Sequence, residues 1–148
     1  MEVVEHSSQQ VFVTSWRNNE LRIMPIGIVQ LDHVNVVVPK SLEEEAKHFY
    51  GSMLGLKEIP KPVELQANGG AWYQLGSVQI HLSAKAEATA EQACKGHVCY
   101  TVADVPLAEE HLRAGGVEII PDDQPMPGKP RFYVRDPGGN LIELAQQI

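Results

Sequence analysis

The chain has 148 residues, of which 43% are hydrophobic and 21% charged. This length fits one ordinary domain with a real hydrophobic core, and the composition is that of a globular protein. The net charge of -7 and the lack of a basic cluster argue against nucleic acids and anionic membranes as partners. No stretch has the length of a membrane span, and the acidic N-terminus lacks the apolar core of a signal peptide. We therefore expect a cytoplasmic protein.

Residues 1–28 differ in pattern from the rest and are predicted to be an N-terminal extension. Within it, 11–16 and 21–24 resemble two short strands around a polar turn, and Met24 is an alternative start of the chain. Cys94 and Cys99 form neither a C-x-x-C pair nor a disulfide framework. We expect both to be reduced thiols.

From residue 29 onward the same pattern of elements occurs twice. Each copy has a strand, a capped helix and three further strands. The expected strands are 31–38, 55–60, 71–75 and 77–83 in the first copy, and 96–102, 116–121, 131–135 and 141–145 in the second. We therefore predict an α+β fold in a single domain, 29–148. It has two paired βαβββ modules, 29–84 and 96–148, joined by a linker, 85–95, and forming a curved mixed sheet.

Both helices have start signals in the sequence. Ser41 and Glu44 have the spacing of a capping box before the apolar positions of the first helix. The second helix is expected to begin near Asp104 and to end at Gly115 and Gly116, where a left-handed cap is easiest for glycine.

Four potential metal ligands lie on the strand faces opposite the aliphatic residues that pack on the helices. They are His33, His81, His97 and Glu143. The offset from His33 to His97 is 64 residues and that from His81 to Glu143 is 62, so the pattern recurs at similar positions of the two modules. Imidazoles with one carboxylate suit a divalent Zn, Ni, Fe, Mn or Co ion. If the modules curve around a common cavity, the four side chains converge there.

A lone strand histidine is more commonly an ordinary interior or surface residue than a ligand. His6, His48 and His111 are interpreted in that way, the first in the extension and the others on expected helices. Only the joint recurrence of the four residues favours a metal site.

Four segments carry a resemblance to a known family: LDHVNVVVPKSLEEEAKHFYGSMLGLKEI, WYQLGSVQIHLS, GHVCYTVADV and FYVRDPGGNLIELAQ. Through them the chain resembles the vicinal oxygen chelate superfamily, which includes glyoxalase, bleomycin-resistance proteins and extradiol dioxygenases. The RDPGGNLIEL ending is the most specific part. The resemblance implies paired βαβββ modules and a homodimer, since two chains of such proteins commonly complete each cavity.

The resemblance also implies roles for individual residues. His33, His97 and Glu143 match the three metal positions shared by metal-dependent members, and His81 matches the fourth. Glyoxalase I has glutamate at that fourth position and the methylmalonyl-CoA epimerase has glutamine. Tyr133 matches a tyrosine that lies next to the metal ligands in fosfomycin-resistance enzymes.

Some positions depart from each named activity. Val37 stands where glyoxalase I has an arginine for glutathione, and Asn35 stands where the fosfomycin enzymes have threonine. An extradiol dioxygenase normally has four modules, whereas two fit here.

The resemblance implies a metal-dependent lyase or isomerase of the glyoxalase type that chelates a small oxygenated substrate, free or conjugated to a thiol. Glu143, His81 and Tyr133 are its candidate catalytic residues. Candidate substrate contacts are Asn35, Gln74, Cys99, Thr101, Arg131 and Arg135. Two alternatives stay open. One is an Fe(II)-dependent extradiol-type dioxygenase, since two histidines and a carboxylate also bind iron for O₂ chemistry. The other is a metal-free drug-binding protein of the bleomycin-resistance type.

Overall fold

The computed structural model describes residues 27–90 and 96–147. Its contacts divide the chain after Gln30, and the unit 31–148 contains every helix and strand given below. The strands expected at 11–16 and 21–24, together with His6 and Cys94, lie outside the described residues. Every helix in the described part is too short or too polar to cross a membrane.

The first module follows the predicted order, with additional short helical turns. Its strands are β1 (His33–Pro39), β2 (Lys57–Ile59), β3 (Ala71–Leu75) and β4 (Val78–Lys85). Helix α1 (Glu43–Lys47) continues into the π-helical segment η2 (His48–Met53). The 3-10 turns η1 (Lys40–Leu42) and η3 (Val63–Asn68) precede α1 and β3.

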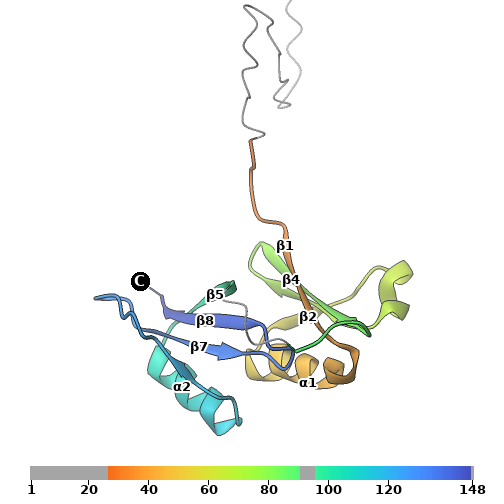
Figure 1. The fold of residues 1–148 in the computed structure, drawn as a ribbon. Helices are drawn as coiled ribbons and strands as arrows, with labels where there is room; N and C mark the ends of the chain where they lie inside the picture. The colour runs from red at the N-terminus through yellow and green to blue at the C-terminus, as the bar shows by residue number, and fades with distance from the viewer. Residues whose placement is uncertain (1–26, 91–95, 148) are drawn as a thin grey trace, which may run out of the picture. The chain divides into compact units, whose positions relative to one another are not determined.

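The second module repeats this order more simply. It consists of β5 (His97–Val102), α2 (Val105–Ala114), β6 (Ile120–Pro121), β7 (Arg131–Arg135) and β8 (Leu141–Gln146). Figure 1 shows α1 and α2 both below the labelled strands of the two modules.

Each module forms a four-stranded mixed sheet. The strand orders are β1-β4-β3-β2 and β5-β8-β7-β6. In each sheet the first strand pairs in parallel with the last, and the other pairs are antiparallel. The predicted α+β fold of paired βαβββ modules is therefore confirmed.

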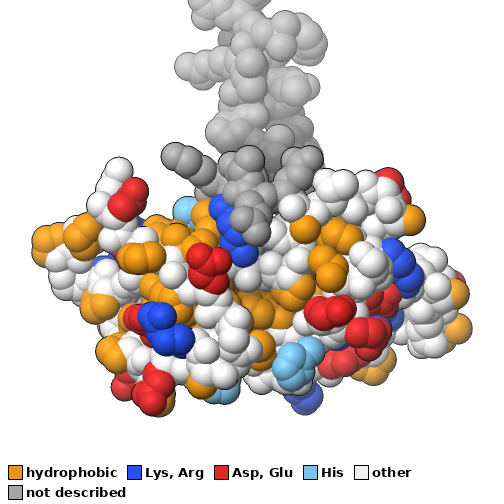
Figure 2. Space-filling model, turned by 60° about the horizontal axis from the view of Figure 1, so that its bottom comes forward, with side chains coloured by type: hydrophobic (Ala, Val, Ile, Leu, Met, Phe, Trp, Pro, Cys, Tyr) orange, Lys and Arg blue, Asp and Glu red, His pale blue; other side chains and the backbone are white. Residues whose placement is uncertain are grey.

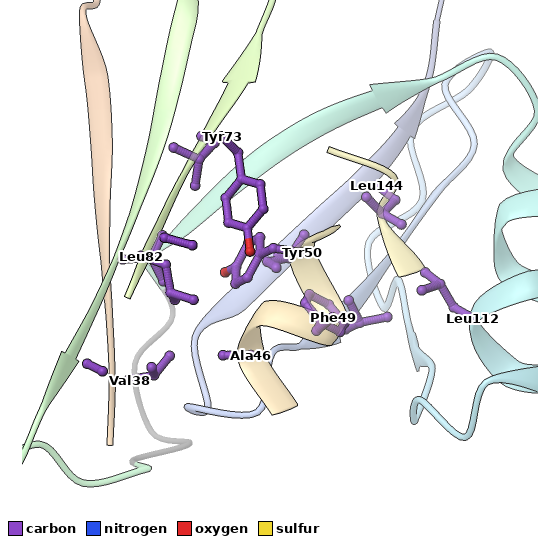
Figure 3. Close-up of a cluster of buried hydrophobic side chains, with 14 of the residues drawn as sticks. Val38, Ala46, Phe49, Tyr50, Tyr73, Leu82, Leu112 and Leu144 are labelled. Carbon is purple, nitrogen blue, oxygen red and sulfur yellow. The ribbon is translucent and has the colours of Figure 1, made fainter. Parts of the chain in front are cut away.

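The aliphatic faces of both sheets share one hydrophobic core. Val38, Leu82 and Leu144 are each at most 3% exposed and belong to the same cluster as Phe49 and Tyr50 of η2. Figure 3 shows Tyr50 and Phe49 between Leu82 of the first sheet and Leu144 of the second. The alternation predicted from the sequence is thus confirmed, because the aliphatic residues face the helices.

The turn that joins β7 to β8 fastens the second module to the first. The Tyr50 hydroxyl donates to Asp136 Oδ2 at 2.7 Å, and Asn140 Nδ2 donates to the backbone oxygen of Val37 at 3.0 Å. A Cβ atom on Gly138 would lie 2.6 Å from Val38 Cγ1, so a larger residue does not fit there. The turn at 136–140 therefore fastens the two modules together.

The start of α1 differs from the prediction. No side chain caps η1 or α1, so the capping box expected from Ser41 and Glu44 is wrong. Instead the buried Glu43 contacts Lys40 and Lys47 and accepts a hydrogen bond from the Gly70 backbone at 2.7 Å. The hydrogen bond from Lys40 has the largest effect and, with those from Lys47 and Gly70, lowers the pKa of Glu43 to about 2. Burial alone would raise this pKa.

The signals of α2 are confirmed. The side chain of Asp104 accepts from the backbone N–H of Leu107 at 2.9 Å, and Gly116 has a left-handed φ of 82° just after the helix.

Figure 2 shows basic side chains scattered singly among acidic and hydrophobic ones on one face of the molecule.

Candidate functional site

The four predicted ligands occupy the same register positions in the two modules. His33 and His97 each open the first strand of their sheet. Two residues further along, Asn35 pairs with His81 on β4, and Cys99 pairs with Glu143 on β8. Each module therefore presents two ligand-type side chains from neighbouring parallel strands. We call His33 and His81 the first pair, and His97 and Glu143 the second pair.

In the first pair the two imidazole rings are stacked. Their centroids lie 4.2 Å apart at 14°, and the Trp72 ring stacks on the other side of His81 at 3.8 Å and 1°. His33 Nδ1 lies 2.7 Å from Asp32 Oδ2, and His81 Nε2 lies 2.8 Å from Gln79 Oε1. Burial, and then His33, lower the pKa of His81, which favours its neutral, metal-binding form.

In the second pair a histidine contacts a buried carboxylate. His97 Nε2 lies 2.9 Å from Glu143 Oε2, and the Glu143 side chain is 6% exposed. The Tyr133 ring meets the His97 ring edge-on, with centroids 5.6 Å apart. Burial, and then Glu143, raise the pKa of Tyr133, so its hydroxyl stays protonated near neutral pH.

The guanidinium of Arg131 lies next to the carboxylate of Glu143. Arg131 Nη1 lies 3.4 Å from Glu143 Oε1, while Arg131 Nε donates to Asp122 Oδ2 at 2.7 Å. The Arg131 hydrogen bond lowers the pKa of Asp122. Arg131 therefore bridges two carboxylates.

The other candidate substrate residues lie in more varied surroundings. Asn35 accepts from the Ser83 hydroxyl at 2.7 Å on the face of the first pair. Gln74 donates to Gly76 O at 2.7 Å, within the turn between β3 and β4. Arg135 donates to Gly139 O at 2.8 Å, within the turn between β7 and β8. The last two contacts are structural ones within turns.

Cys99 and Thr101 border an apolar cavity of about 440 Å³ between η2, α2 and β5. Cys99 is an exposed free thiol. Burial, and then Glu143, raise the pKa of Cys99, which makes it a weak nucleophile at neutral pH.

The two pairs do not come together within one chain. Among residues 27–90 and 96–147, no group of three or more His, Cys, Asp or Glu side chains is arranged to hold a metal ion. The edge strands β1 and β5 belong to different sheets, and a hollow of about 220 Å³ lined by Asn35 and His97 lies between them. The hypothesis that all four ligands converge therefore does not hold inside a single copy.

The sequence pattern of the Glyoxalase/Bleomycin resistance protein/Dioxygenase superfamily matches residues 30–144. The chain belongs to this superfamily. Its structure is similar to that of a glyoxalase family protein from Bacillus anthracis. The TM-score is 0.73 and the sequence identity 38%, over 84% of this chain and 100% of that one.

Two further solved structures show the same fold. The fosfomycin resistance protein FosX from Listeria monocytogenes is 20% identical, with a TM-score of 0.67 over 80% of this chain and 91% of its own. A glyoxalase/dioxygenase from Nostoc punctiforme is 19% identical, with a TM-score of 0.70 over 88% and 99%. A FosX variant was crystallised with Mn(II) and dihydroxypropylphosphonic acid. No curated protein gives a significant match to this chain.

Several residues around the pairs were not predicted from the sequence. Gln79 lies two residues before His81, so strand alternation puts both side chains on the same face, and this contact could have been predicted from the sequence. Asp32 is the chain neighbour of His33. Asp122 lies after β6, 21 or more residues from every ligand, and no local pattern indicates its contact with Arg131.

Proposed function

We propose that this superfamily member is a divalent-metal-dependent enzyme, a lyase or isomerase of the glyoxalase type, that binds a small oxygenated substrate, free or conjugated to a thiol. The observation that carries the proposal is the shared register of the two pairs. Unrelated structural residues have no reason to recur at the first position of β1 and β5 and opposite the third position on β4 and β8. A duplicated binding site has such a reason.

The donor set fits a borderline divalent ion. His33 Nδ1 is held by Asp32, which leaves Nε2 as the ligand atom, as in many carboxylate–histidine–metal arrangements. His97 and Glu143 already meet at 2.9 Å, whereas His81 ligates through Nε2 only if Gln79 releases it. Zn, Ni, Fe, Mn and Co all accept such nitrogen and oxygen donors.

The charges around the pairs define the chemistry. Three neutral imidazoles and one carboxylate leave a divalent ion with a net charge of about +1, which favours an anionic substrate. When bound, the ion would stabilise negative charge that develops on a substrate oxygen. Glu143 and His81 are the candidate bases, and the protonated Tyr133 hydroxyl is a candidate donor to the substrate. Arg131 has Nη1 close to Glu143 and is placed to contact a substrate anion there.

The proposal includes a homodimer in which the first pair of one copy faces the second pair of the other. Each pair has only two ligands, and His33 and His97 have side chains 43% and 35% exposed on edge strands. Two ligands leave a divalent ion undercoordinated, so each pair needs further donors.

Mixed dimers test this arrangement directly. One chain carries H33A and H81A, the other carries H97A and E143Q, and the two have different affinity tags. We expect the isolated mixed dimer to bind one metal ion, because one of its two sites keeps all four ligands, whereas each homodimer binds none. If the mixed dimer also binds no metal, each copy builds its own site and the shared arrangement is wrong.

Metal content of the untagged protein tests the function itself. We expect a stoichiometric divalent metal, lost in H97A and retained in H48A, which removes an exposed histidine outside both pairs. Far-UV circular dichroism checks that both variants are folded. Absence of stoichiometric metal at any supply would remove the enzyme proposal and favour a metal-free binding protein of the bleomycin-resistance type.

The donor set also favours a second candidate, an Fe(II)-dependent extradiol-type dioxygenase. His33, His97 and Glu143 make up two histidines and one carboxylate, the ligand set of many non-haem iron oxygenases. Spectroscopy of the Fe(II) form with O₂ and catechols separates the two enzymes. Cleavage of the catechol ring would favour the dioxygenase, and the absence of any reaction with O₂ and catechol would favour the lyase or isomerase.

The expected cytoplasmic location is tested by cell fractionation.

A further inference from the structure

The indole of Trp72 covers one whole face of a proposed metal ligand. Its ring lies parallel to the His81 ring, at 3.8 Å between centroids and 1° between planes. His33 covers the opposite face of His81 at 4.2 Å. The His81 imidazole is therefore held between two aromatic rings, which limits its rotation about the side-chain bonds.

The edge of the same ring is held as well. His81 Nε2 lies 2.8 Å from the side-chain oxygen of Gln79, two residues earlier on β4. Trp72, half-buried on β3, lies directly across from His81 in the antiparallel register. The stacking on Trp72 and His33 fixes the plane of the imidazole, whereas the Gln79 contact occupies Nε2 and is given up when that atom binds a metal.

The duplicated module places an aromatic residue at the same position. Tyr133 on β7 lies directly across from Glu143 on β8, as Trp72 on β3 lies across from His81 on β4. In each module an aromatic side chain thus flanks the ligand of the last strand. This recurrence sets Trp72 apart from an ordinary packing residue.

We infer that Trp72 is a positioning residue that holds the plane of the His81 imidazole, so that Nε2 binds a metal once Gln79 releases it. The inference rests on the metal-dependent function proposed above. An imidazole already ordered before the ion arrives loses less side-chain freedom on binding, so the metal binds more tightly. Partners that orient metal ligands commonly change affinity by about 10- to 100-fold.

Metal titrations of four forms of the full chain test the inference. The dissociation constant for Ni(II) is measured by competition with a chromophoric chelator for the wild-type chain, W72L, W72F and L75A. Leu75 is an exposed residue of the same strand, on the opposite face from Trp72, and serves as the matched control. We expect W72L to bind about tenfold more weakly, W72F to stay within about threefold because it keeps an aromatic face, and L75A to be unchanged.

A spectroscopic measurement does not depend on how well W72L folds. In W16F, Trp72 is the single remaining tryptophan, so its emission should be quenched by Ni(II) in step with metal occupancy. Unchanged affinity in W72L, or unquenched emission in a W16F chain that holds the metal, would overturn the inference and leave the proposed function intact. If the wild-type chain binds no Ni(II) or any other divalent metal, the proposed function fails and the inference fails with it.

Discussion

The hydrogen bond between Tyr50 and Asp136 should contribute measurably to the stability of the two-module unit. Tyr50 is 1% exposed and its hydroxyl donates to the buried Asp136 at 2.7 Å across the module junction. Y50F removes this donor and leaves the ring in place. Tyr73 is a matched control, because it is also 1% exposed but its hydroxyl contacts Lys47 O only at 3.4 Å.

The expected magnitude follows from these contacts. A hydrogen bond to a charged group typically contributes about 1.5–3 kcal/mol to the free energy of unfolding. Asp136 keeps two donor atoms of Asn140, the backbone N and Nδ2, so we expect the lower part of that range, about 2 kcal/mol, for Y50F. For Y73F the lost contact is long, and we expect about 0.5 kcal/mol or less.

Urea unfolding at neutral pH measures both values, at equal protein concentrations because association alters apparent stability. For a chain of this length, about 2 kcal/mol also lowers the midpoint of thermal unfolding by roughly 4–8 °C. If Y50F and Y73F have the same unfolding free energy within about 0.5 kcal/mol, the turn does not fasten the modules in the way described.

Three further outcomes are expected. E43Q should lower the unfolding free energy near neutral pH by about 2 kcal/mol, because the lowered pKa of Glu43 stabilises the fold at pH values above its unfolded-state pKa of 4.5. The difference between E43Q and the wild-type chain should vanish as the pH falls toward 2. A difference that does not depend on pH would contradict this reasoning. G70A should lower the unfolding free energy by more than about 3 kcal/mol, because its Cβ would lie 2.0 Å from the backbone oxygen of Leu82. Gly76 also has a left-handed φ, but a Cβ there would meet no atom within 4 Å. G76A should therefore lower the unfolding free energy by only about 1–2 kcal/mol in the same urea assay. R131M should raise the pKa of Asp122 toward its ordinary value in a carboxyl NMR titration, and an unchanged pKa would exclude the ion pair.

Local patterns predicted the fold well. Alternation along single strands is enough to assign Ile80, Leu82 and Ile142 to the core, because side chains of a strand must point to opposite faces. The same alternation put His81 and Glu143 on the other face, and the recurrence of the pattern indicated the two modules. The start of the second helix was predicted near Asp104, where the contact that caps it is local, since its partner Leu107 is only three residues away.

Contacts between distant residues could not be predicted in this way. The Ser41 capping box fails because Glu43 binds Lys40, Lys47 and Gly70, the last of which lies 27 residues away. The separation of the ligands into two pairs within one chain depends on how the sheets are joined, and no strand-level pattern contains that information.

The way in which the β7–β8 turn holds β1 has a consequence for how such proteins diversify. The Asn140 side chain donates a hydrogen bond to the backbone oxygen of Val37, an atom that every amino acid has. The Val37 side chain is 41% exposed on the ligand-bearing face. Position 37 is therefore free to exchange one side chain for another without loosening the joint behind it. Substitution there would change the side chain on the ligand-bearing face of β1 and leave the turn that joins the two modules intact.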